Sequence, residues 1–257
     1  MESPDPESKV ESTTDPTAQA ATGSANVLWK ILFTAGLAGL AGGVALDQTR
    51  NKFDRKFTTY SNPTPEQTIK FNRERQAALR FSVAASTGIA GACMAGVIGL
   101  GFGLVRRSAI ATVSGLTIGT IAGTGLVGVG GMAGQHYYAV VSTSGAQPSL
   151  LHAIVIQLTF WIPLVVAVGL AVGWRGKFVG FLQTNLVLLG AGMLASVAVP
   201  ILTAILIVLT PQNTRDAIPP DTLSYCLFMT IPGTILVGFL LWKDLLDDFR
   251  RTTNKLA

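Results

Sequence analysis

Residues 81–105 read FSVAASTGIAGACMAGVIGLGFGLV, with no Asp, Glu, Lys or Arg among them. About 20 apolar residues, rising 1.5 Å each, cross a hydrocarbon core of about 30 Å, so this stretch can span a membrane as one helix. A helix also satisfies every backbone N–H and C=O where water is absent. Gly91, Gly99 and Gly103, together with Ala95, recur at four-residue steps, which places them on one ridge of that helix. We therefore expect a transmembrane helix with a face that a neighbouring backbone can approach closely.

Apolar stretches of similar length lie on both sides of this segment. By the same criterion the sequence predicts further spans at Val27–Leu46, Ala109–Gly134, Ala153–Gly173, Phe178–Leu209 and Tyr225–Trp242. The fifth span exceeds one straight crossing, so we expect Pro200 to kink it or its first turns to lie in the interface. The expected fold is an all-α, polytopic membrane helical bundle over residues 27–242, with about six transmembrane helices and Gly-rich close packing in the first three.

The composition agrees with lipid as the solvent. Charged residues make up 13% of the chain, about half the share of a soluble protein, and the mean hydropathy is +0.48. The net charge of +5 is typical of membrane proteins that retain Lys and Arg on the cytoplasmic side. No basic run is interleaved with stacking aromatic residues, so we expect no nucleic-acid binding.

The two ends of the chain are polar. Residues 1–26 are rich in Ser, Thr, Pro and Glu and cannot bury enough apolar surface to offset their ordering entropy, which predicts a disordered acidic tail. Residues 243–257 form a second polar tail. The chain opens acidic and delays its apolar core, unlike a secretory signal, so we expect the first apolar segment to remain as a membrane anchor.

The basic connector 47–80 is the only sizeable extramembrane element that the sequence predicts between spans. Within it, Thr64-Pro65-Glu66-Gln67 offers an N-cap, a proline at the first helical position and a Gln that can close a capping box. Glu66 and Lys70 have the spacing of a favourable i,i+4 pair. We expect a helix that starts near Pro65 and runs without a break into the second span, as a stalk above the membrane.

The orientation in the membrane is nearly tied by charge. Six spans leave ten Lys and Arg on the side of the tails and nine on the side of the long connector. If short loops dominate, both termini are cytoplasmic. In a five-span alternative, the Gly-rich segment 81–105 enters and returns on one side, which gives sixteen positive residues against three. That alternative needs non-helical backbone in lipid, so we expect six spans.

Glycine is the most distinctive feature of the spans. Residues at four-residue spacing are expected to pack the first three helices: Gly39, Gly43, Gly91, Gly99, Gly103, Gly115, Gly119 and Gly123. An internal packing core is the favoured interpretation. A homo-oligomer, including a pore-like assembly, and a flexible, insertion-prone hairpin stay open as alternatives.

The span interiors hold no Asp, Glu, Lys or Arg, which disfavours proton-coupled transport and voltage sensing. Their deepest polar groups are Gln157, Gln183 and Asn185, which are candidates for a polar path for a neutral solute. Interhelical hydrogen bonding is the favoured interpretation of the three. Pro163, Pro200 and Pro232 are interpreted as helix kinks in preference to a substrate site in broken helices.

Enzymatic chemistry finds little support. The only histidines, His136 and His152, lie beside the uncharged connector 135–150, which supplies neither an acid nor a thiol as a partner. Cys93 and Cys226 fall inside apolar segments without metal-ligand spacing. We expect no catalytic residues, no metal and no cofactor.

The connector is the best candidate for an interaction. Its contact residues are expected to be Arg50, Lys52, Arg55, Lys56, Lys70, Arg73 and Arg80, which suit an acidic protein partner or anionic lipid. The sequence thus favours a non-enzymatic structural or interaction protein, multi-pass in a bacterial cytoplasmic membrane. A small transporter or channel for a neutral or weakly charged solute is the alternative.

Overall fold

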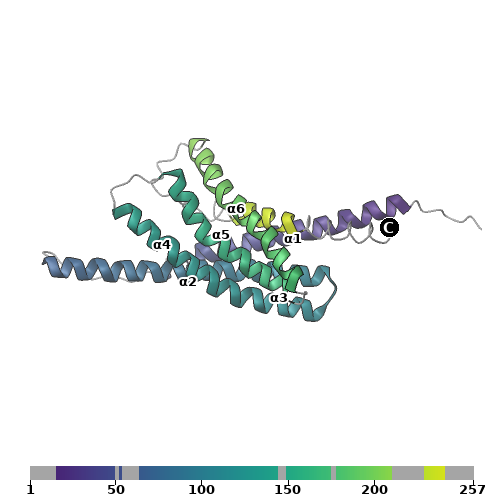
Figure 1. Ribbon diagram of the computed structural model, residues 1–257, viewed down its shortest axis with the longest axis horizontal. Helices are drawn as coiled ribbons and strands as arrows, with labels where there is room; N and C mark the ends of the chain where they lie inside the picture. The colour runs from purple at the N-terminus through teal and green to yellow at the C-terminus, as the bar shows by residue number, and fades with distance from the viewer. Residues whose placement is uncertain are drawn as a thin grey trace, which may run out of the picture.

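The computed structural model describes residues 16–49, 52–53, 64–143, 149–174, 178–209 and 229–240. Regular structure in these residues is entirely helical, as predicted, and they form no strand. The helices are α1 (Pro16–Thr49), α2 (Pro65–Val105), α3 (Ala109–Ala122), the π-helical segment η1 (Gly123–Val127), α4 (Gly128–Thr143), α5 (Leu150–Gly173) and α6 (Phe178–Leu209). A shorter apolar helix, Met229–Leu240, packs with them. Figure 1 shows a bundle from which the N-terminal part of α2 projects at one end and the N-terminal part of α1 at the other.

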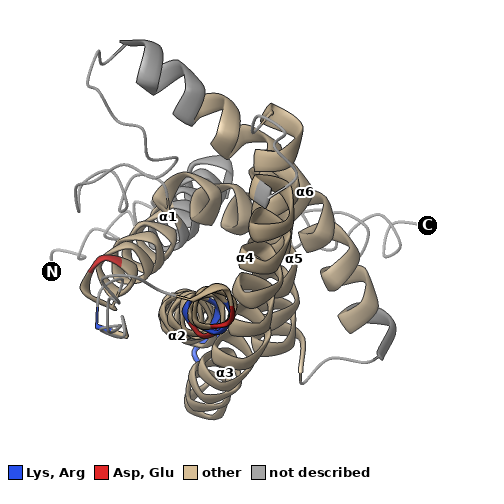
Figure 2. Cartoon of the chain, turned by 90° about the vertical axis from the view of Figure 1, so that its left-hand side faces the viewer, with Lys and Arg blue, Asp and Glu red and all other residues tan. Residues whose placement is uncertain are grey.

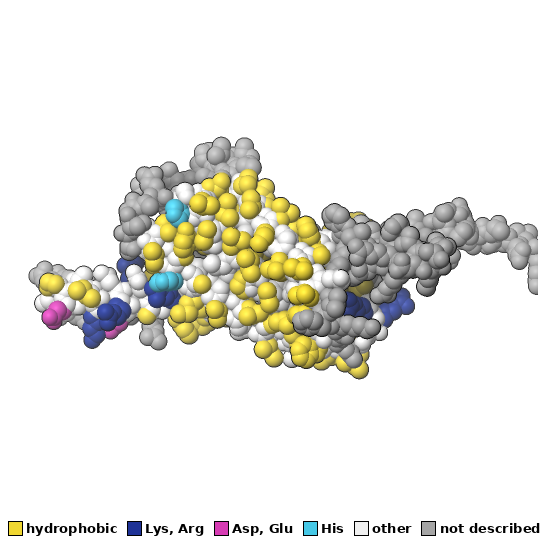
Figure 3. All heavy atoms as spheres, viewed as in Figure 1, with side chains coloured by type: hydrophobic (Ala, Val, Ile, Leu, Met, Phe, Trp, Pro, Cys, Tyr) yellow, Lys and Arg dark blue, Asp and Glu magenta, His cyan; other side chains and the backbone are white. Residues whose placement is uncertain are grey.

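Four helical segments of the described chain are long and apolar enough to cross a membrane, namely Pro65–Val105, Ala109–Ser142, Leu150–Gly173 and Phe181–Leu202. The first predicted span, Val27–Leu46, lies within α1, and the last falls on Met229–Leu240. Hydrophobic side chains cover the middle of the molecule, and Lys and Arg gather toward its two ends (Figure 3). This distribution is that of a helical membrane protein.

Helix boundaries differ from the prediction in two places. α1 begins at Pro16, so residues 16–26 of the predicted disordered tail are helical, and residues 1–15 lie outside the described chain. Pro16 suits the first helical position, and the Ala-rich residues that follow favour a helix. The third predicted span ended at Gly134, but the helix continues to Thr143. No proline interrupts residues 135–143, so His136 lies on a helix and not in a connector.

The five-span alternative is wrong, because α2 is one uninterrupted helix through residues 81–105. α1 runs antiparallel to it, since Gly101 of α2 faces Thr34 whereas Met94 faces Gly42. The beginning of α1 therefore lies at the Arg106 end of α2, and the end of α1 lies at the stalk end. The C-terminal end of α5 also reaches the Arg106 end, where Arg106 Nη1 donates to the carbonyl of Val172 at 3.4 Å.

The helix from α3 to α4 contains five π-helical residues, Gly123–Val127. A π-helical turn leaves the regular i→i−4 ladder, so local carbonyls need other partners. Thr87 of α2 faces this turn, and its Oγ1 lies 3.4 Å from the Val127 carbonyl while donating to the Val83 carbonyl at 2.7 Å. The π-helical segment thus lies directly against α2.

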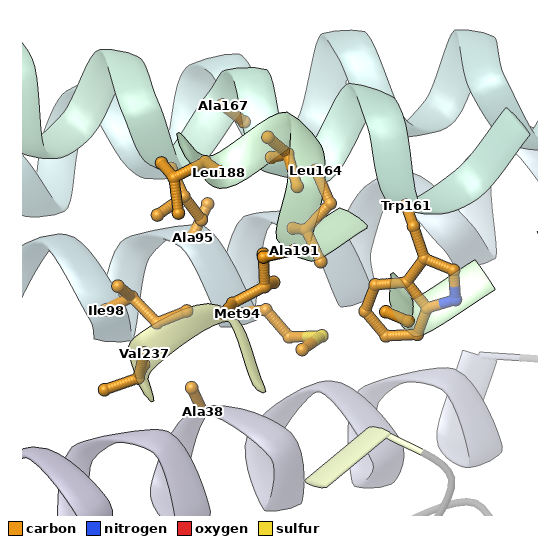
Figure 4. Close-up of a cluster of buried hydrophobic side chains, with 14 of the residues drawn as sticks. Ala38, Met94, Ala95, Ile98, Trp161, Leu164, Ala167, Leu188, Ala191 and Val237 are labelled. Atoms are coloured by element: carbon orange, nitrogen blue, oxygen red, sulfur yellow. The ribbon is translucent and has the colours of Figure 1, made fainter. Parts of the chain in front are cut away.

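Met94 of α2 lies among side chains from the other helices of the bundle. Figure 4 shows it between Ala38 of α1, Ala191 of α6 and Val237 of Met229–Leu240, with Trp161 of α5 at the edge of the cluster. These side chains are fully or almost fully buried. An unbranched thioether adapts to such an irregular space between small residues.

The prolines do not end the helices. Pro163 and Pro200 lie inside α5 and α6, and Pro232 lies inside Met229–Leu240. Pro163 also packs on α4, because a Cβ at Gly130 would lie 2.8 Å from its Cγ. Helices in lipid tolerate proline where neighbouring helices compensate for the lost hydrogen bond.

Four-residue spacing of small residues brings the backbones of α2 and α3 together. A Cβ added at Gly99 would collide with the carbonyl oxygen of Gly115, and one added at Gly115 would lie 2.5 Å from that of Gly99. The same relation holds one turn away on each side, where Gly119 meets the Ala95 carbonyl and Gly103 meets Thr112. The contacts form an antiparallel register along the two helices.

The remaining glycines of the predicted ridges are also buried. Gly91 faces Val127 and the carbonyl of Gly123. On α1, a Cβ at Gly39 would collide with the backbone of Thr230, and Gly43 is buried in the same helix.

We expect Gly99→Ala and Gly115→Ala each to lower the free energy of unfolding by about 1–3 kcal/mol, because a methyl group at either position meets backbone that cannot rotate away. Thermal unfolding of the purified chain in neutral detergent measures the loss. Gly36→Ala is the matched control, since a Cβ there meets nothing within 4 Å. Equal effects of all three changes would contradict close backbone contact.

Candidate functional site

The stalk, residues 65–80, begins with the predicted capping box. The backbone N–H of Gln67 donates to Thr64 Oγ1 at 3.3 Å, and the backbone N–H of Thr64 donates to Gln67 Oε1 at 2.9 Å. Pro65 occupies the first helical position, where its missing N–H costs nothing. The helix then continues into the bundle without a break, as predicted.

The stalk exposes nearly all of its side chains. Between Pro65 and Arg80 only Phe71, Ala78 and Arg80 are half-buried. Lys70, Arg73 and Arg75 are exposed, and the predicted pair of Glu66 with Lys70 is wrong, because these two residues form no ion pair in this described part of the chain. Figure 2 looks at the stalk end, where the charged residues ring the near end of α2.

An apolar side chain lies within this basic surface. Ile69 is 63% exposed, and Arg73 follows it at the i,i+4 position on the same face of the helix. Arginine is enriched in protein interfaces, whose centres are more apolar than the rest of the surface. Of the predicted contact residues, Lys70 and Arg73 therefore both lie exposed on the stalk.

The base of the stalk meets the bundle at Arg80 and Phe81. Arg80 Nε is enclosed without a hydrogen-bond partner, and Arg80 is half-buried. The ring of Phe53, from the connector, contacts the ring of Phe81 edge to face at 6.3 Å. Lys52 is exposed next to Phe53, so it lies near this base. Arg50, Arg55 and Lys56 lie outside the described residues.

The three candidates for a polar path are not brought together. Gln157 Oε1 accepts a hydrogen bond from Trp161 Nε1 on the same helix at 3.0 Å. Gln183 is exposed on the outer surface of α6. Asn185 packs against Gly169 of α5, which lies about 18 Å along that helix from Gln157 at 1.5 Å per residue.

Asn185 makes a contact between helices instead. Its Nδ2 donates to the carbonyl of Phe181 at 2.9 Å, whereas its Oδ1 is buried without a hydrogen-bond partner. A Cβ at Gly169 would collide with that oxygen, so Oδ1 lies against the Gly169 backbone, where a weak Cα–H···O contact can form.

A small recess of about 20 Å³ lies where α2, α3 and α5 meet, lined by Gly103, Arg106, Ser114 and Val172 among others. This volume holds about one water molecule. None of the three polar-path candidates lines it.

The histidines have local roles. The backbone N–H of Ser149 donates to His152 Nδ1 at 3.2 Å, and Ser149 Oγ lies 2.7 Å from the same nitrogen, so His152 caps the start of α5. His136 is exposed on α4. Across the described residues, no group of three His, Cys, Asp or Glu could hold a metal ion. Cys226 lies outside those residues, and Cys93 is half-buried on α2.

The sequence interpretation predicted the short connection between the second and third spans, but it did not name Arg106 and Arg107 as candidate site residues. Only Arg106, Arg107 and Ser108 separate the two helices, and Arg107 has a positive φ of 52°. A signal for the site was present, because two adjacent arginines lie between two long apolar stretches.

We expect Thr64→Ala to weaken the first turn of the stalk by about 1 kcal/mol, because the side-chain acceptor for the Gln67 amide is lost. Hydrogen exchange at the amides of Gln67 and Thr68 in the intact protein measures it. Thr64→Ser keeps the acceptor and is the control. Unchanged exchange in Thr64→Ala would contradict the capping role.

We expect Gly169→Ala to destabilise the bundle by about 1–3 kcal/mol, because its methyl group meets Asn185 Oδ1. In an Asn185→Ala background the same change should cost less, since the obstructing amide is gone. A double-mutant cycle on unfolding in detergent measures the difference. Strict additivity would show that the two residues do not touch.

Protein-family models, curated proteins and solved structures were all compared with this chain, and none of them matches it.

Proposed function

We propose that this multi-pass membrane protein is a non-enzymatic anchor that holds a basic helix away from the membrane for an acidic protein partner. The observation that carries the proposal is the continuity of α2. One helix of 41 residues, about 60 Å long at 1.5 Å per residue, contributes both the glycine contacts of the bundle and the exposed stalk.

The continuity makes the stalk a rod whose position the bundle fixes. The packed part of α2 begins within its apolar sequence and is held against η1 at Gly91 and against α3 at Gly99 and Gly103. Neither glycine nor proline interrupts the helix between Pro65 and Gly88. A helix held in this way presents its side chains without the ordering cost of a flexible tail.

Charge and distance favour a protein partner over lipid along most of the stalk. Arg73 and Lys70 lie about 10 and 15 Å beyond Arg80 along the helix axis, at 1.5 Å per residue. The apolar sequence begins at Phe81, so these two charges lie outside the hydrocarbon core. The head groups extend about 5–7 Å beyond the hydrocarbon core, so Arg73 lies near their outer edge. Lys70 lies about one screening length, about 8 Å, outside them.

The alternative of a transporter gains no support from the candidates of the polar path, which face different surroundings.

We expect vesicles that contain the purified chain to shrink and swell in a glycerol gradient at the rate of empty vesicles, measured by stopped-flow light scattering. Faster glycerol entry that Asn185→Leu abolishes would favour transport. The assignment to a bacterial cytoplasmic membrane stays a prediction from the sequence.

The anchor proposal predicts position-specific crosslinking in cells that express the full chain. A photoreactive amino acid at Asn72 or Gln76, both exposed on the stalk, should crosslink to one discrete protein. Charge reversal with Lys70→Glu and Arg73→Glu should lower the yield at least several-fold, because an acidic partner is then repelled. Immunoblotting of the tagged chain measures the crosslinked fraction.

Val113 and Leu186, exposed on the apolar surface of the bundle, provide the control positions and should give no such product. Lys70→Arg with Arg73→Lys keeps the charge and should preserve the crosslink. If the charge-reversed stalk crosslinks as well as the wild type, or if only lipid adducts form, the proposal of an acidic protein partner fails.

A further inference from the structure

The turn that joins α2 to α3 is closed by backbone hydrogen bonds. The N–H of Arg107 donates to the carbonyl of Leu104 at 3.0 Å, and the N–H of Ser108 donates to that of Gly103 at 3.2 Å. These two bonds form a Schellman motif, in which the residue after the cap adopts a left-handed conformation. Ser108 Oγ then accepts from the N–H of Ala111 at 3.3 Å and caps α3.

Glycine is the residue that this position favours, yet Arg107 occupies it. Its φ of 52° is the only positive φ among the non-glycine residues described. A side chain in this conformation carries strain that glycine avoids. A strained backbone at one identified residue is a reason to look for a use of its side chain.

Arg106 and Arg107 have exposed side chains, and no carboxylate of the described residues lies at their end of the bundle. Among the described residues the carboxylates are Asp47, Glu66 and Glu74, which lie on the last turn of α1 and on the stalk, at the opposite end of α2. Within the described part of the chain, the hydrogen bond from Arg106 to Val172 is the only polar contact of either guanidinium.

The aromatic residues place this turn at the membrane surface. Trp174 follows the last residue of α5 and is 65% exposed, and the neighbouring Val172 carbonyl receives Arg106. Trp29 is exposed on α1 at the same end, since Thr34 faces Gly101 and α1 runs antiparallel to α2. Exposed tryptophans are typical of the head-group level of a bilayer.

We infer that Arg106 and Arg107 form a binding site for the phosphate of an anionic phospholipid. Guanidinium groups bind phosphate oxygens through directed hydrogen bonds. The recess beside Arg106 holds about one water molecule, so the phosphate lies outside it, on the two guanidinium groups. Basic clusters between transmembrane helices at the cytoplasmic surface bind anionic head groups in this way.

The site has a consequence for orientation. Anionic lipid is concentrated in the cytoplasmic leaflet, so a lipid-binding turn places the Arg106 end of the bundle on the cytoplasmic side. The stalk, at the other end of α2, then lies on the opposite side of the membrane. The inference therefore gives an orientation, which the nearly equal numbers of Lys and Arg on the two sides leave open.

The test uses the full chain reconstituted into phosphatidylcholine vesicles that contain phosphatidylglycerol with brominated acyl chains. Trp29→Phe with Trp242→Phe leaves Trp174 as the exposed reporter beside the site, with Trp161 buried as background. Quenching of its fluorescence gives the binding of phosphatidylglycerol relative to brominated phosphatidylcholine. Each arginine replaced by Gln should lower this preference about fivefold, and added salt should weaken it.

Arg107→Gly separates the charge from the turn. Glycine suits the backbone, so this variant should unfold at the same or a higher temperature and still lose lipid preference. Arg106→Lys with Arg107→Lys keeps the charges and should retain most of the preference. Lys70→Gln with Arg73→Gln on the stalk is the control and should not change it.

Two outcomes overturn the inference. The double variant Arg106→Gln with Arg107→Gly should lose the preference for phosphatidylglycerol. If its fluorescence is quenched like that of the wild type, the arginines do not bind the lipid. Inorganic phosphate added to the vesicles tests the other source of the same chemistry. If it displaces phosphatidylglycerol from the reporter, the site takes a soluble anion and the assignment to lipid is wrong.

Discussion

The backbone contact of Gly99 with Gly115 is the constraint on which the arrangement of the other helices depends. Lipid tails are as apolar as a leucine side chain, so burial of apolar surface does not drive two helices together inside a membrane. Van der Waals contact does, and it is gained only at close range. Hydrogen in place of a side chain lets the two backbones reach that range over several turns. The register of α2 against α3 follows from these contacts.

Once α2 is held, both of its ends are fixed. At one end, Arg106 and Arg107 close a turn too short to leave the membrane surface. At the other, the same helix continues past Arg80 as the exposed stalk. These two basic groups of the described chain therefore differ in surroundings, since one lies against the bundle with tryptophans nearby and the other projects from it. The positive-inside rule counts the charges of both groups equally, although the two groups lie at opposite ends of α2.

For the polar residues inside the spans, the absence of water limits the choice of hydrogen-bond partners. Gln157 bonds to Trp161 one turn away, and Asn185 bonds to the carbonyl of Phe181. With no water to compete, each amide takes the nearest donor or acceptor, which on a helix is usually its own. Asn185 also shows the cost, because its Oδ1 finds no donor and lies against Gly169.

By itself the sequence determined the helical class, the apolar spans and the start of the stalk. The length of an apolar stretch and the capping box at Thr64 are local properties that can be recognised without the structure. It also identified Lys70 and Arg73 as candidates for an interaction. Their distance from the apolar part of α2 became known only from the structure, in which α2 is one uninterrupted helix. Only the tertiary structure decided that α4 continues to Thr143, that the polar-path residues lie apart, and that Arg107 adopts a left-handed conformation. The separation of the polar-path residues depends on which residues face one another across helices, and residues far apart in the chain carry no local signal of that pairing.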